Sequence, residues 1–217
     1  EGFNLQYMLD TTLADALRTK IKLTDIPIIG CGYDNVPETL EWLIQPNKAL
    51  TEQDSTPYTK LHQLYYASGV SDKFIPLKHK VMTLDPSGSN GDELAFAIGG
   101  ATNSYIYILS VGGFRGGCTP DNMDKVLLKM ISTSTKILDI EKNMGHGTVG
   151  LLFQSHKGAI VTKLKTNVDD IQVLKMLNES GLSKLELIKA LSDISITEYH
   201  VVGQKEKRII DTISPVT

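Results

Sequence analysis

The chain has 217 residues, a formal net charge of -3 and a pI near 6.0, so no whole-molecule positive field attracts it to nucleic acid. Any nucleic-acid surface must therefore be a local basic patch. The length suits one domain with a sizeable extra segment. Two cysteines exclude a disulfide framework and favour a reducing, intracellular setting, and no apolar run approaches the length of a membrane span.

The first 78 residues predict little regular structure. Residues 3–18 carry a mixed apolar pattern compatible with a helix. From residue 21 to residue 78, prolines recur too often for long helices, and only short strands such as residues 26–29 are predicted. We interpret residues 1–78 as a linker or small subdomain. Because the chain begins without Met and stops at Thr217, we expect it to be a fragment of a longer protein.

Residues 81–98 predict a β-hairpin whose first strand ends in an acid. β-Branched and apolar residues lead to Asp85, Pro86 ends the strand pattern, and a Ser/Gly/Asn run turns the chain. Leu94, Phe96 and Ile98 then alternate along the second strand. A carboxylate at a strand end, beside a loop of small residues, can hold a metal ion. The alternative is that Asp85 only initiates the turn.

A third strand and a helix follow the hairpin. Residues 105–111 are rich in β-formers, and we expect Gly112 and Gly113 to end this strand before a glycine-rich loop around Arg115. Pro120 and Asp121 then predict the start of a helix. Its core-facing residues repeat at helical spacing and are Met123, Val126, Leu127, Met130 and Ile131.

Residues 136–143 predict a short strand that also ends in acids. Leu138 and Ile140 take one face, while Asp139 and Glu141 share the other. A helix precedes this strand, so we expect it to lie parallel to an earlier one. Glu141 and Asp85 would then both sit at carboxyl ends of strands, where open α/β sheets bind ligands.

Residues 145–150 match the pattern G-x-G-x-x-G, which suggests a dinucleotide site as an alternative. In that fingerprint the first glycine follows the strand directly. Here four residues intervene, and Glu141 places a negative charge where pyrophosphate would bind. The nicotinamide-dinucleotide enzyme is therefore the secondary interpretation.

The last third of the chain predicts helices, a strand and a closing helix. Residues 160–195 contain two apolar helical patterns divided at Gly181, residues 196–202 predict a strand, and residues 203–213 predict a helix. On that helix, Asp211 falls away from the isoleucine stripe, with Lys207 and Arg208 on its flanks. Asp211 is therefore either a functional acid or an exposed one that pairs with Lys207.

Asp85, Glu141 and Asp211 are far apart in sequence but suit one kind of chemistry. Two Mg²⁺ or Mn²⁺ ions can hold the attacking water and the leaving oxygen of a phosphodiester when carboxylates gather around them. These hard cations take oxygen ligands, and no Cys/His cluster with zinc-ligand spacing is present in the sequence.

Three motifs carry a resemblance to a known family. They are LDPSGSNGDE at residues 84–93, IEKNMG at residues 140–145 and GQKEKRIIDT at residues 203–212. Their order and sequence resemble the nuclease domain of bacteriophage large terminase subunits of the type found in T7-like podoviruses. LQYMLD at residues 5–10 also resembles the stretch that follows the ATPase domain in those proteins.

The resemblance implies an α/β fold, with a ribonuclease-H-like mixed central sheet flanked by helices, in residues 79–217. It implies a two-metal DNA endonuclease that uses Mg²⁺ or Mn²⁺ and cuts concatemeric genomes during packaging. Asp85, Glu141 and Asp211 would be catalytic metal ligands, and Asp92 matches a further family acid. Residues 155–195 are longer than the family pattern leads us to expect.

The resemblance also implies partners. These are double-stranded DNA, an ATPase domain in the same full-length chain, the portal and the small terminase subunit, all in the host cell cytoplasm. Candidate phosphate contacts are Lys142, Lys205, Lys207, Arg208 and Arg115, each with the alternative of an ordinary surface cation. A non-catalytic docking module of the packaging motor is a further alternative.

Overall fold

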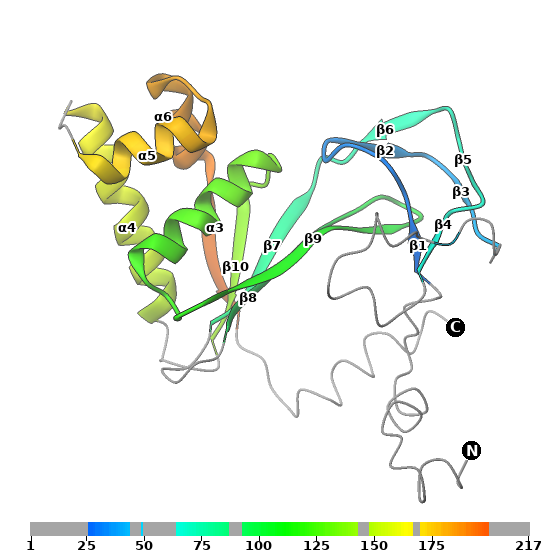
Figure 1. Ribbon diagram of the computed structural model, residues 1–217, viewed down its shortest axis with the longest axis horizontal. Helices are drawn as coiled ribbons and strands as arrows, with labels where there is room; N and C mark the ends of the chain where they lie inside the picture. Colours follow the sequence, from blue (N-terminus) through cyan, green and yellow to red (C-terminus); the bar gives the residue numbers. More distant parts are fainter. Residues whose placement is uncertain are drawn as a thin grey trace, which may run out of the picture. The chain divides into compact units, whose positions relative to one another are not determined.

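The computed structural model describes residues 26–43, 49, 64–86, 93–142, 148–166 and 170–199 (Figure 1). They divide between two compact units. The smaller unit includes Pro37–Ile75, and the larger is built from Gly32–Val36 and Pro76–Val201. The division between residues 1–78 and 79–217 remains a prediction. No helix in the described ranges has the length and apolar character to cross a membrane.

The described residues between 26 and 76 form short strands, as the frequent prolines predict. In this part of the chain the structure describes three two-stranded sheets, β1 with β4, β3 with β5, and β2 with β6. The strands are β1 (Pro27–Ile28), β2 (Asn35–Pro37), β3 (Leu40–Glu41), β4 (Tyr65–Tyr66), β5 (Gly69–Val70) and β6 (Phe74–Pro76).

A mixed five-stranded sheet organises the larger unit, with the strand order β11-β10-β7-β8-β9. β7, β8 and β9 are antiparallel neighbours, whereas β10 runs parallel to both β7 and β11. The predicted hairpin and the predicted parallel strand are therefore confirmed. The strands are β7 (Lys80–Asp85), β8 (Glu93–Ala101), β9 (Ile106–Arg115), β10 (Ile137–Glu141) and β11 (Ser195–Tyr199).

The predicted end of the third strand is wrong, because β9 continues through both glycines to Arg115. Gly112 pairs with Phe96, and Gly113 pairs with Ala95. A Cβ at Gly112 would lie 3.0 Å from the Phe96 ring, and one at Gly113 would lie 2.8 Å from the Glu93 carboxylate. The glycines make room for cross-strand side chains, although glycine in a strand more often marks a bulge or an end.

Four helices are described. α3 begins at Pro120, as predicted, spans Pro120–Ser132 and is capped by Thr119. α5 (Ile171–Ser180) ends at Gly181, whose φ of 65° is left-handed. α6 (Lys184–Asp193) starts with a capping box. α4 (Thr148–Lys165) has 18 residues and precedes the two helices predicted on either side of Gly181, so it is a helix that the sequence pattern did not predict. Its buried positions are few and include Gly150, so its apolar stripe is weak.

The four helices lie against one face of the sheet (Figure 1). That face carries alternating buried residues of the strands, among them Met82, Leu84 and Ile98, each with no exposed surface. The helices add Leu127 and Phe153, which are also fully buried. Burying apolar surface in this way is the main favourable contribution to folding.

Two buried polar side chains, Asp124 and Lys80, form hydrogen bonds between separate segments of the larger unit. Asp124 of α3 accepts hydrogen bonds from His156 of α4 at 2.7 Å and from Gln172 at 2.6 Å. Lys80 is 6% exposed, and its ammonium donates to Asp34, to the Tyr33 carbonyl at 3.2 Å and to the Thr133 carbonyl at 2.6 Å. Each buried charge thus has hydrogen-bonding partners, as its burial requires.

Replacing Lys80 by methionine should lower the free energy of unfolding by about 2 kcal/mol, because two carbonyl groups lose their donor. Urea denaturation would measure this loss. The matched control is Lys73→Met, where the Lys73–Glu38 ion pair is exposed and the change should be below about 0.5 kcal/mol. Equal effects of the two substitutions would contradict the role of Lys80.

The same cluster predicts a pH dependence. The hydrogen bond from Lys80 lowers the pKa of Asp34 from its ordinary value of 3.8. A lowered pKa means that the contribution of this pair is complete above pH 3.8 and is lost as the pH falls below it. The difference in stability between parent and Lys80→Met should therefore shrink in acid.

Candidate active site

Two carboxylates meet at the carboxyl edge of the sheet. Asp85 is the last residue of β7, and Glu141 is the last residue of β10. In this parallel pair Ile140 is opposite Leu84, so the two acids follow one residue later on neighbouring strands, which lie about 4.8 Å apart. Asp85 is partly buried, and Glu141 is 8% exposed. The predicted placement of both acids at this edge is confirmed.

Both acids lie on the sheet face opposite the helices. Leu84 and Ile140 point into the helix-covered core, where they are 0% and 1% exposed. Side chains alternate along a strand, so Asp85 and Glu141 take the other face. On that face Thr83 and Ala95 are exposed. On the side that the described helices do not cover, Asp85 is therefore partly exposed, whereas Glu141 is buried.

The chemistry of these two side chains fits a hard divalent cation. Two carboxylates on adjacent strands repel each other, and a cation between them would relieve that repulsion. Oxygen ligands of this kind suit Mg²⁺ or Mn²⁺. Within the described ranges, no group of three Asp, Glu, His or Cys side chains gathers as a metal site would require. Five predicted residues lie outside those ranges, namely Asp92, Asp211, Lys205, Lys207 and Arg208.

Arg115 is at the same edge, two strands away from Asp85. It is opposite Glu93 in the β8–β9 ladder, and its side chain is 88% exposed. Asp85 pairs with Ala95, which pairs with Gly113, so Arg115 follows on the same face as the acids. Its Nε is 3.4 Å from Glu93 Oε1, an exposed contact that leaves the guanidinium accessible.

Lys142 is held at the same edge but on the helix side. Its backbone N–H donates to the Tyr199 carbonyl at 2.9 Å. Its ammonium is 3.8 Å from Glu198 Oε2, and the other oxygen of Glu198 accepts the Gly150 N–H at 2.9 Å. Sequence reasoning missed Glu198, for which the available signal was an acidic residue inside a predicted strand.

The contact with Glu198 also explains Gly150, the last glycine of the G-x-G-x-x-G pattern. A Cβ at this position would lie only 2.5 Å from Glu198 Oε1. The described start of α4 thus presents an N–H to a protein carboxylate, whereas a dinucleotide site presents it to pyrophosphate. Residues 143–147 of the pattern lie outside the described ranges.

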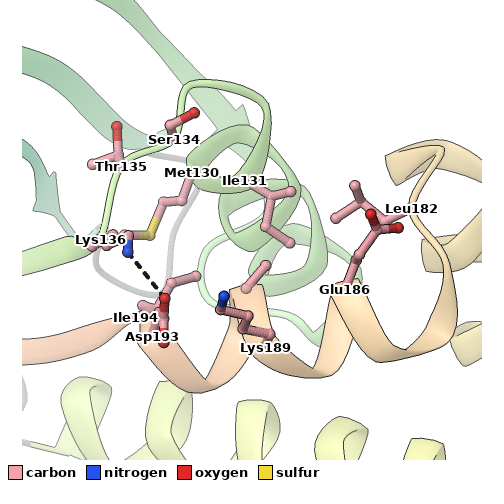
Figure 2. A pocket seen from close by; sticks show the side chains of 11 residues that line it. Met130, Ile131, Ser134, Thr135, Lys136, Leu182, Glu186, Lys189, Asp193 and Ile194 are labelled. Carbon is pink, nitrogen blue, oxygen red and sulfur yellow. Dashed lines mark hydrogen bonds and ion pairs between the residues drawn. The ribbon is translucent and has the colours of Figure 1, made fainter. Parts of the chain in front are cut away.

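A pocket of about 290 Å³ opens at the other end of the sheet, between α3 and α6 (Figure 2). Its walls include Met130, Leu182 and Ile194, and the Lys136–Asp193 ion pair of 3.0 Å crosses it. Lys136 precedes β10, so the pocket is at the amino end of the strand whose carboxyl end carries Glu141. It is therefore separate from the two acids.

Comparison with known proteins identifies the family. The family described as "Terminase Bacteriophage T7, Ribonuclease H-like domain" matches residues 84–217. The chain is also 26% identical, over 220 residues, to the "Terminase, large subunit" of Enterobacteria phage T3, and the alignment covers 99% of this chain. It covers 31% of that relative, so the chain spans about a third of its length.

The family match and the sheet topology agree. The match extends over more than half of the chain. It includes β8, β9, β10 and β11 of the mixed sheet in full, and the last two residues of β7, Leu84 and Asp85. The predicted α/β, ribonuclease-H-like fold is therefore confirmed, and this chain belongs to the T7 terminase family with a ribonuclease H-like domain.

Proposed function

We propose that this chain is the nuclease domain of a terminase and a metal-dependent endonuclease that cuts concatemeric double-stranded DNA. The observation that carries the proposal is the pair Asp85 and Glu141, on neighbouring parallel strands of a terminase ribonuclease H-like domain. Carboxylates so placed suit hydrolysis of a phosphodiester.

In this proposal Asp85 and Glu141 hold the divalent cations, together with Asp211 and Asp92. Two Mg²⁺ or Mn²⁺ ions would supply an activated water and stabilise charge on the attacking and leaving oxygens. The DNA backbone would approach from the sheet face opposite the described helices, and Arg115 would bind a phosphate at the same edge. Further phosphate contacts would come from Lys205, Lys207 and Arg208, and from Lys142 on the helix side of the same edge.

The partners follow from the family. We propose double-stranded DNA as the substrate, and an ATPase domain in the same full-length chain, the portal and the small terminase subunit as the other partners. Genome packaging and cleavage would take place in the host cell cytoplasm. Residues 79–217 would form the nuclease domain, and residues 1–78 would connect it to the ATPase domain.

Asp85→Asn and Glu141→Gln should abolish metal-dependent nicking while the protein stays folded, because each removes a ligand charge at nearly constant volume. The assay is conversion of supercoiled plasmid with Mn²⁺, with and without chelator, alongside thermal denaturation of each variant. Asp139→Asn is the matched control, since Asp139 is on the same strand and face but hydrogen-bonds Thr197 at 2.6 Å. Cleavage at the parental rate by either variant would refute the site, and a parent that never nicks DNA would leave only a docking role.

Binding to DNA should weaken steeply with salt and depend little on sequence, because phosphate contacts release counterions. Arg115→Gln should lower the affinity uniformly across sequences and reduce the slope of log affinity against log salt by about 1. Fluorescence anisotropy with two unrelated duplexes would measure both effects. A slope unchanged by the substitution would remove Arg115 from the interface.

Asp211→Asn should reduce cleavage by orders of magnitude and weaken Mn²⁺ binding, whereas Lys207→Ala should mainly weaken DNA binding. Cleavage rates and calorimetric Mn²⁺ titrations separate these effects. If Asp211 only pairs with Lys207 at the surface, both substitutions should leave cleavage within a few-fold of the parent.

The alternative of a nicotinamide-dinucleotide enzyme makes a different prediction. Because Glu198 already accepts the Gly150 N–H, millimolar NAD⁺ or NADH should not raise the melting temperature. Differential scanning fluorimetry would detect binding as a rise that depends on concentration. Such a rise would favour the dinucleotide enzyme over the nuclease.

A further inference from the structure

Lys142 follows Glu141 directly, which places a cationic side chain beside the two acids. Lys142 and Ile140 extend to the same side of β10, and Ile140 is opposite Glu198 on β11. The Lys142 ammonium accordingly lies 3.8 Å from Glu198 Oε2, on the helix side of the sheet. Asp85 and Glu141 extend to the other side.

Glu198 is fixed independently of this lysine. Its Oε1 accepts the Gly150 N–H at 2.9 Å, and its side chain is 22% exposed. Gly150 allows this contact because it has no Cβ, which would lie 2.5 Å from the carboxylate oxygen. The first turn of α4 therefore holds the carboxylate in place.

The backbone of Lys142 is fixed too, by its hydrogen bond to the Tyr199 carbonyl at 2.9 Å. The remaining freedom of this residue is the direction of its flexible side chain. The Lys142 Nζ is 3.8 Å from Glu198 Oε2, which is too far for a hydrogen bond. The attraction between the two charges therefore holds the ammonium near Glu198. Without Glu198, the nearest strand-end carboxylates to attract it would be Glu141 and Asp85.

An ammonium ion between those two acids would neutralise them and compete with any divalent cation. We propose that Glu198 is a positioning residue, which keeps the Lys142 ammonium on the helix side and so out of the site where Asp85 and Glu141 would hold Mg²⁺ or Mn²⁺. This inference rests on the proposed function, because it assumes that the two acids bind metal.

The test is a double-mutant cycle on Mn²⁺ affinity, measured by calorimetry on the whole chain without DNA. Glu198→Gln keeps an oxygen that can accept the Gly150 N–H, and it should weaken Mn²⁺ binding about threefold to fivefold. Lys142→Gln should change the affinity little in the parent and restore it in the Glu198→Gln background. The effects of the two substitutions on Mn²⁺ affinity should therefore not be additive, which is the coupling that the cycle measures.

Two further variants serve as a second test of the Glu198 position and as a control. Gly150→Ala should displace the carboxylate and weaken Mn²⁺ binding in the same direction as Glu198→Gln. The matched control is Asp193→Asn, which breaks the 3.0 Å ion pair with Lys136 at the other end of the sheet and should leave Mn²⁺ affinity unchanged (Figure 2). Melting temperatures of all variants would separate loss of fold from loss of metal binding.

The outcomes distinguish this inference from the proposed function. If Lys142→Gln has the same effect on Mn²⁺ affinity in both backgrounds, the two residues act additively and the positioning role is refuted, while the metal site stands. If the parent binds no Mn²⁺, the proposed function falls and the inference falls with it.

Discussion

The parallel pairing of β7 with β10 is the constraint on which the rest of the site depends. It sets Ile140 opposite Leu84, and the next residue on each strand is an acid. A slip of one residue would turn the whole apolar set of a strand away from the core, so the helices that bury Leu84 and Ile140 also fix the positions of Asp85 and Glu141. Packing energy on one face thus holds two like charges together on the other.

The helix layer does more than cover the core. Asp124, His156 and Gln172 join α3, α4 and α5 through short hydrogen bonds, so the layer is bound internally as well as to the sheet. The start of α4 contacts Glu198 on β11, beside the carboxyl edge. The segment that exceeded the family expectation, residues 155–195, is mostly this helical layer. It supports the strands that carry the acids, and the charged residues on it are largely a solvated surface.

Sequence reasoning succeeded where a local pattern is decisive. Alternation of Leu94, Phe96 and Ile98 predicted the hairpin, and the chain order of strand, helix and strand predicted the parallel placement of Glu141. It failed where a tertiary contact determines the residue type. Gly112 and Gly113 resemble a strand end, but they accommodate neighbouring side chains, and Gly150 resembles a phosphate loop, but it accommodates Glu198. The roles proposed for Asp85 and Glu141 came from the family resemblance, because one strand-end acid alone is also a common turn residue.

The central claim is that Asp85 and Glu141 together bind divalent metal. Anomalous diffraction from crystals of this chain soaked in Mn²⁺ would test it most directly, since the scattering locates the ions themselves. The account predicts an anomalous peak within coordination distance of both carboxylates, and its loss in crystals of the Asp85→Asn variant. Peaks only at other sites, or none at a Mn²⁺ concentration that supports cleavage, would contradict it.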